Sequence, residues 1–200
     1  MKLNIPNQQE GNEVNVQNSI VVPSHESAEL FFNGAMKRLI HVNEWHTLTD
    51  PSLSRFQLTD SDGKEIFRAV HEGDLIRIDI PAPGTLAGEG YDWVKVEDID
   101  YRFGRTMDSL SIRVRPVSSP FHPEEGVAHF FDESATSTFN VFKMGLTVGA
   151  GIYGRNETPN VKSEKIVDNI RNAAIAVGAI LGASKIQWSR LVKGILEMKD

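Results

Sequence analysis

Residues 146–155 read LTVGAGIYGR, and the glycines of GAGIYG at 149–154 have the spacing G-x-G-x-x-G that is typical of dinucleotide-binding loops. Such a loop needs a strand before it, a helix that begins at its third glycine and an acidic residue about 20 positions later. Gly154 is instead followed by RNETPN, so Pro159 stands where the helix should already be running. We therefore reject a nucleotide-binding loop here.

The same stretch alternates as a β-strand does. One face carries Leu146, Val148, Ala150 and Ile152, and the other carries Thr147, Gly149, Gly151, Tyr153 and Arg155. Glycines inside a strand indicate sharp curvature or the close approach of another part of the chain. The sequence therefore predicts a curved last strand with Gly149 and Gly151 on one face.

Helical spacing predicts a first helix over 25–41 with Ser24 as its N-cap, and a short helical turn over 43–48. Period-two segments between and around them predict strands over 14–22, 56–60, 65–70, 75–80, 92–99, 110–116, 127–132, 137–143 and 146–155. After Pro159 the helical period returns and continues to Ile195, with a break expected near Gly182.

This order predicts an α+β fold in which a curved antiparallel sheet of about six to seven strands packs on a long C-terminal helix. The alternative is a partly closed β-barrel with terminal helices, SH3-like around EGDLIRIDIP at 72–81 and DWVKVE at 92–97. We expect residues 1–13 to form a flexible N-terminus and residues 14–200 to form one α+β domain.

The composition of the chain excludes several classes of protein and partner. A net charge of −6 argues against a nucleic-acid partner, which would need a basic face. The absence of cysteine excludes disulfides, iron–sulfur clusters and thiol nucleophiles. The longest apolar run, Ala173 to Ala183, is too short to span a membrane, and the N-terminus has no secretory pattern, so we expect a cytoplasmic protein.

Residues that carry chemistry are few. The six histidines show no metal-ligand spacing, so we predict no metal, no cofactor and no catalytic residue. Aromatic and histidine side chains are the candidates for ligand contacts. These candidates are Trp45, His46, Trp93, His129, Phe131 and Tyr153.

The element order, the stretch SIVVPSHESAELFFNGAMKRLIHVNEW at 19–45 and the final helix resemble the START-like (SRPBCC) helix-grip superfamily. The chain departs from that pattern in the extra helical residues 184–200 and in the long loop 81–90. The resemblance implies a deep, mostly apolar cavity between helix and sheet. Proteins of this fold bind lipids, sterols, polyketides or other hydrophobic molecules, and some catalyse cyclisation or hydrolysis.

We therefore expect the chain to bind a small hydrophobic, lipid-like or polyketide-like molecule without catalysis, in a cavity of roughly 300 Å³ or more. The alternative is a protein-interaction surface or a homodimeric scaffold, indicated by Trp188, Leu191 and the small residues Ala174, Gly178 and Gly182. A weaker alternative is a cavity enzyme of the cyclase or hydrolase type that uses His46 or His129.

Overall fold

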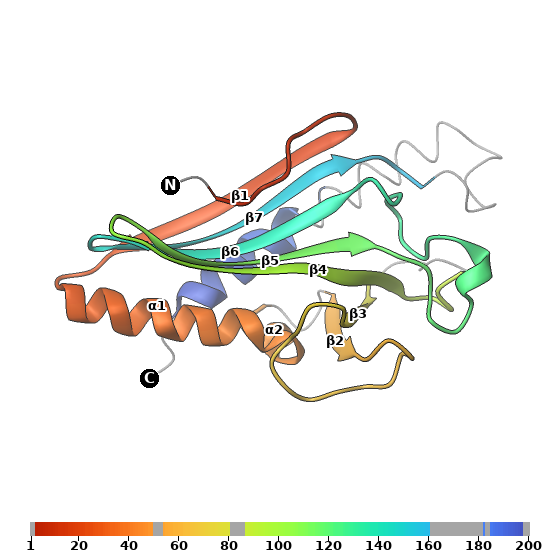
Figure 1. The fold of residues 1–200 in the computed structure, drawn as a ribbon, viewed down its shortest axis with the longest axis horizontal. Coiled ribbons are helices and arrows are strands. Elements are labelled where there is room, and N and C mark those ends of the chain that lie inside the picture. Colours follow the sequence, from red (N-terminus) through yellow and green to blue (C-terminus); the bar gives the residue numbers. More distant parts are fainter. Residues whose placement is uncertain (1–2, 50–53, 81–86, 161–181, 183–184, 198–200) are drawn as a thin grey trace.

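The structure is a computed structural model that describes residues 3–49, 54–80, 87–160, 182 and 185–197 (Figure 1). Its strands are β1 (Asn12–Val21), β2 (Arg55–Thr59), β3 (Leu75–Asp79), β4 (Asp92–Phe103), β5 (Asp108–Pro116), β6 (Thr136–Met144) and β7 (Thr147–Glu157). Its helices are α1 (His25–Ile40) and α2 (Trp45–Leu48), with the 3₁₀ turns η1 (Val42–Glu44) and η2 (Pro123–Glu125). Residues 185–196 are also helical.

All seven strands form one antiparallel sheet in the order β1-β7-β6-β5-β4-β3-β2. β1 and β2 are its two edges and do not pair with each other, so the sheet is open and the barrel alternative is wrong. The α+β class and the antiparallel sheet predicted from the sequence are confirmed. The sheet packs against the C-terminal helical residues, which is the helix-grip arrangement.

Helix α1 and the helical residues 185–196 bury one face of the sheet, which we call the inner face. α1 begins at Ser24, whose hydroxyl accepts the backbone N–H of Ser27 as predicted for an N-cap. Its buried side chains share one core with side chains of residues 185–196 and with the inner face. This core includes Ala28, Phe32, Ala35 and Leu39 of α1, and Leu191, Val192, Ile195 and Leu196. The Arg38 guanidinium also donates to the carbonyl of Ile195 at 2.7 Å, which connects α1 to the end of the helical residues 185–196.

The glycines of β7 leave room for aromatic rings on the opposite, outer face. A Cβ built at Gly149 would collide with the ring of Phe142 on β6, and one at Gly151 would lie 2.6 Å from the hydroxyl oxygen of Tyr153. The alternating partners Val148, Ala150 and Ile152 are buried in the core of the inner face. The predicted assignment of faces is confirmed, and β7 continues as a strand to Glu157 with no helix after Gly154.

A β-bulge interrupts the alternation near the end of β7. Asn12 pairs with Glu157 and Val14 pairs with Gly154, so three steps on β7 oppose two on β1. Asn156 carries the bulge with a φ of 55°, in the left-handed region that asparagine tolerates better than most residues. The extra residue turns Glu157 to the inner face, beside Gly154.

The strand predicted over 65–70 is wrong. Only Glu65 makes a bridge, to Thr59, and β2 pairs with β3 instead. Asn43 explains the difference, because its side chain accepts the N–H of Leu58 and donates to the carbonyl of Ile66. A side chain thus takes backbone groups that a strand ladder would need.

The strand predicted over 127–132 is also wrong. This segment makes two isolated bridges, Ser118 to Val127 and Phe131 to Pro159, and is otherwise a loop. Its backbone groups are bound by side chains, among them the amide of Asn160, which donates to the carbonyls of Val127 and His129.

Three other expectations remain untested. The break near Gly182 and the small-residue ladder lie outside the described residues, except for Gly182 itself. The flexibility of residues 1–13 stays a prediction, although Gln8 of this segment accepts the N–H of Asn156 at 3.0 Å.

We predict that Gly149→Val destabilises the fold by about 1–3 kcal/mol, because the added atoms overlap the ring of Phe142. Urea unfolding of the single and double variants measures the effect. In a Phe142→Ala background the same change should cost markedly less, since the ring is gone. An equal cost in both backgrounds would contradict the contact.

We also predict that Gly194→Ala destabilises the fold by about 2 kcal/mol, because a Cβ there would overlap the carbonyl oxygen of Leu48 and lie 2.7 Å from its Cβ. The matched control is Gly182→Ala, where no atom of the described residues lies within 4 Å of the new Cβ. Alanine there should change the stability by no more than about 0.5 kcal/mol. A loss of stability in thermal unfolding is therefore expected for Gly194→Ala alone, and equal shifts would refute the docking of residues 185–196 against α2.

Candidate functional site

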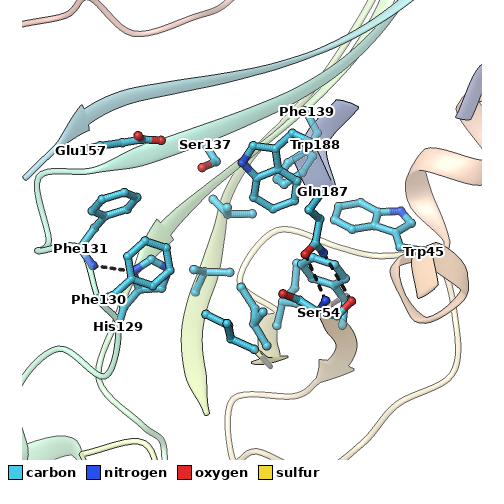
Figure 2. Close-up of a pocket in the computed structure, with 16 residues that line it drawn as sticks. Trp45, Ser54, His129, Phe130, Phe131, Ser137, Phe139, Glu157, Gln187 and Trp188 are labelled. Carbon is cyan, nitrogen blue, oxygen red and sulfur yellow. Dashed lines mark hydrogen bonds between the residues drawn. The ribbon is translucent and has the colours of Figure 1, made fainter. Parts of the chain in front are cut away.

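A narrow apolar cavity lies between the inner face of the sheet, the loop 128–131 and the helical residues 187–188 (Figure 2). It leaves about 60 Å³ for the centres of water-sized spheres. Its walls are aromatic and aliphatic side chains, interrupted by a few polar groups. The polar groups are Ser54, His129, Ser137, Glu157 and Gln187.

One end of the cavity is an aromatic cluster. The ring centroid of Trp45 lies 5.3 Å from that of Phe56 and 4.7 Å from that of Phe139, and Phe139 lies 5.5 Å from Trp188. These rings come from α2, β2, β6 and the C-terminal helical residues. The cluster therefore joins α2 and β2, which are close in the sequence, to β6 and the C-terminal helical residues, which are far from them.

Gln187 fastens the same wall through its amide. Its side-chain oxygen accepts the N–H of Ser54 at 3.1 Å, and its nitrogen donates to the carbonyl of Ser54 at 3.4 Å. Both groups of a buried amide are thus used. This reciprocal pair holds the helical residues against the start of β2.

The other end of the cavity is the loop that carries His129. The imidazole Nδ1 accepts the N–H of Phe131 at 2.9 Å, and burial lowers the pKa of His129 to about 3. His129 is therefore neutral near pH 7 and carries its proton on Nε2. Nε2 lies 3.9 Å from the Oδ2 atom of Asp92, which is beyond hydrogen-bond distance.

Asp92 supports this loop from the first position of β4. Burial raises its pKa to about 7, and the backbone N–H of Phe130, which donates to the carboxyl group, acts in the opposite direction. Among the described residues its Oδ2 atom has no hydrogen-bond partner. The loop is thus held from β4 by Asp92, and from the segment after β7 by Asn160.

Glu157 is the carboxyl group that faces the cavity. The residue is only 4% exposed, and its Oε2 atom is buried without a hydrogen-bond partner among the described residues. Burial raises its pKa to about 7, and the charge of Arg155 opposes that rise. Regular strand alternation predicts that Glu157 lies on the outer face. The one signal of a bulge in the sequence is Asn156, a residue type that tolerates a positive φ.

The structure brings three of the six predicted ligand-contact residues together. Trp45, His129 and Phe131 all line the cavity. Trp45 also fills the core as a fully buried side chain.

The other three lie elsewhere. His46 is exposed beside a wider, polar hollow of about 440 Å³ against β2 and β3. Trp93 is buried in a second cluster, with its ring 5.8 Å from that of Phe121. Tyr153 lies on the outer face and donates to Gln17 at 3.3 Å.

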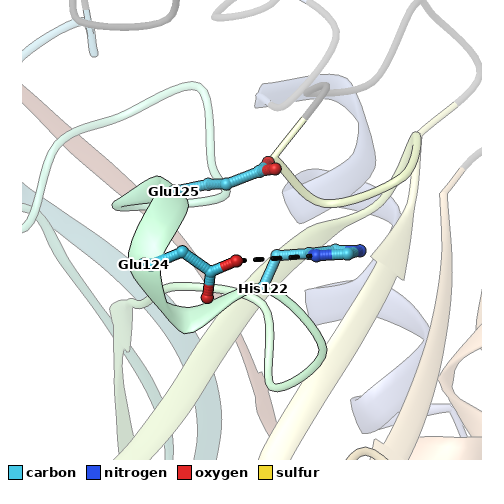
Figure 3. A group of neighbouring side chains, drawn as sticks. All are labelled: His122, Glu124 and Glu125. Atoms are coloured by element: carbon cyan, nitrogen blue, oxygen red, sulfur yellow. Dashed lines mark ion pairs between the residues drawn. The ribbon is translucent and has the colours of Figure 1, made fainter.

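One surface group has metal-ligand chemistry. His122, Glu124 and Glu125 lie at η2, with their ligand atoms within 4.8 Å of one another (Figure 3). The Nε2 atom of His122 already pairs with Glu89 at 3.0 Å, which raises the pKa of the imidazole. Both glutamates of the group are exposed, and the ion pairs of His122 with Glu89 and Glu124 account for the position of the imidazole.

No family model matches the sequence. No curated protein matches it either. Among solved structures, the chain is similar to a hypothetical protein from Helicobacter pylori (11% identity, TM-score 0.45, covering 90% of this chain and 86% of that one). It is also similar to Ara h 8.0201, with 11% identity and a TM-score of 0.34 over 92% of this chain and 99% of that one. A protein from Staphylococcus epidermidis shows 14% identity and a TM-score of 0.38 over 96% of each chain.

In the part of the chain that the structure describes, no helix is both long and apolar enough to cross a membrane.

We predict that Glu157→Gln makes the protein more stable than the wild type at pH 8, by up to about 3 kcal/mol. The folded state keeps a proton on Glu157 that the unfolded chain releases between about pH 4.5 and 7, so wild-type stability falls as pH rises through that window. The gain should shrink towards zero near pH 4. Urea unfolding from pH 4 to 8 measures it, with the exposed Glu133→Gln as control. A gain that does not change with pH would contradict the buried carboxyl group.

Proposed function

We propose that the chain binds a small hydrophobic molecule in the cavity between the sheet and the C-terminal helical residues, without catalysing a reaction. The observation that carries the proposal is the mainly apolar lining of aromatic and aliphatic side chains with a few polar groups. This is the usual composition of small-molecule sites. The wider hollow beside His46 is polar, and Arg77 there already pairs with Glu65 at 2.8 Å.

The cavity volume bears on the size of the ligand. About 60 Å³ is less than the roughly 300 Å³ at the lower end of drug-sized sites. A lipid-like or polyketide-like molecule therefore has to displace wall side chains. Trp188 and Phe130 are suited to this, because both line the cavity yet are only partly buried.

The state of His129 favours binding over the cyclase or hydrolase alternative. A general base needs an unprotonated nitrogen that faces the substrate. Nδ1 of His129 is occupied by the N–H of Phe131, and Nε2 carries the proton. His46 lies outside the cavity, so neither histidine is placed as a base within it.

Two of the side chains that suggested the protein-interaction alternative are not available on the surface. Leu191 is fully buried, and Trp188 packs on Phe139 and Phe56. Both residues belong to the core rather than to an exposed surface. A homodimer, a cytoplasmic location and the absence of a nucleic-acid partner remain predictions from the sequence.

Native mass spectrometry of the freshly purified protein tests the proposal. We expect a fraction of the protein to carry a co-purified organic molecule that solvent extraction removes. Ser137→Leu should reduce that fraction at least about tenfold, because the larger side chain fills the narrow cavity.

The matched control is Ser19→Leu, the same change at an exposed position of β1. It should leave the bound fraction unchanged. A wild-type protein that carries no molecule and gives no NMR shifts at the cavity residues with millimolar ethylbenzene, benzyl alcohol or benzylamine would refute the proposal.

A further inference from the structure

The position of the Glu157 carboxyl group is created by two features of β7. The bulge at Asn156 turns the side chain inward. The absence of a side chain at Gly154 then leaves the space for it, because a Cβ at Gly154 would overlap its Oε1 atom. The carboxyl group is thus accommodated in the wall of an apolar cavity, although burying it there is costly.

Among the residues that the structure describes, no lysine or arginine neutralises this group inside the cavity. The described lining residues include Glu157 but no lysine or arginine. Arg155 is two residues away on β7, yet its guanidinium is engaged on the β1 side. It donates to the carbonyls of Val14 and Gly154 at 3.2 and 2.7 Å and to the side chain of Asn15 at 2.8 Å.

The other buried acid near the cavity has a different role. Asp92 accepts the N–H of Phe130 and adjoins His129, so it supports the loop 128–131. Asp92 does not line the cavity. Among the acids that the structure describes, Glu157 is therefore the one placed to contact an occupant.

We propose that the occupant is an apolar amine, whose protonated nitrogen pairs with the carboxylate of Glu157 while its hydrocarbon body contacts the aromatic walls. This inference rests on the proposed function and names the class of ligand. A buried Oε2 atom without a partner needs a donor, and a cationic donor makes the stronger bond. The rings of Phe131, Phe139 and Trp188 line the same cavity and tolerate a cation better than aliphatic walls do. A fatty acid would instead bring a second negative charge into the site.

Three probes of one shape test the proposal: benzylamine, benzyl alcohol and ethylbenzene. Their affinities for the full chain are measured at pH 7.5 by NMR titration. We expect benzylamine to bind at least about tenfold more tightly than either of the others, the ratio expected for one charge-assisted hydrogen bond.

Two variants locate the effect. Glu157→Gln keeps the shape of the side chain but removes the charge, and should abolish the preference for benzylamine while ethylbenzene binds as before. Gly154→Ala displaces the carboxyl group and should weaken benzylamine in the same direction. Glu133→Gln, an exposed glutamate, is the control and should change nothing.

The outcomes separate the two proposals. If the probes bind without a preference for the amine, or if Glu157→Gln retains that preference, the amine assignment is overturned and the apolar cavity stands. If benzyl alcohol binds as tightly as benzylamine, Glu157 acts as a neutral acceptor and the charge pairing is wrong. If none of the three probes binds, the proposed function fails and the amine assignment fails with it.

Discussion

Burial of one face of the open antiparallel sheet under α1 and the helical residues 185–196 is the constraint on which the rest of this structure depends. The apolar side chains of α1 and of residues 185–196 share one core with the inner face of β5 to β7. The close approach of Gly194 to Leu48 and the hydrogen bond from Arg38 to Ile195 hold residues 185–196 in this position. The cavity lies at the part of this interface where the aromatic cluster and the loop 128–131 meet.

Burying polar groups in that cavity costs folding free energy, and the groups differ in how many hydrogen bonds compensate for that cost. Gln187 and His129 have their buried acceptors occupied by backbone N–H groups. Glu157 keeps a buried oxygen without a partner, and its raised pKa reflects the same lack of compensation. A buried group that lowers stability is typical of binding sites, because function and stability often conflict there.

Sequence periodicity predicted those elements whose pattern reflects burial on one face. α1 with its cap at Ser24 and the split of β7 into a core face and a glycine face were both correct. The same reasoning failed over 65–70 and 127–132, where Asn43 and Asn160 bind the backbone from distant parts of the chain. Of the six predicted contact residues, Trp45, His129 and Phe131 line the cavity. The other three do not, because aromatic and histidine residues also occur for purely structural reasons.

The sequence by itself determined the α+β class, the antiparallel sheet with its helices, and the rejection of a nucleotide loop at GAGIYG. These follow from local properties: side-chain alternation, helix capping and the position of Pro159. Tertiary structure decided which residues share the cavity, how narrow it is, and that Glu157 faces into it. That last feature depends on a one-residue bulge against β1, and a bulge reverses every later side chain without leaving a regular pattern in the sequence.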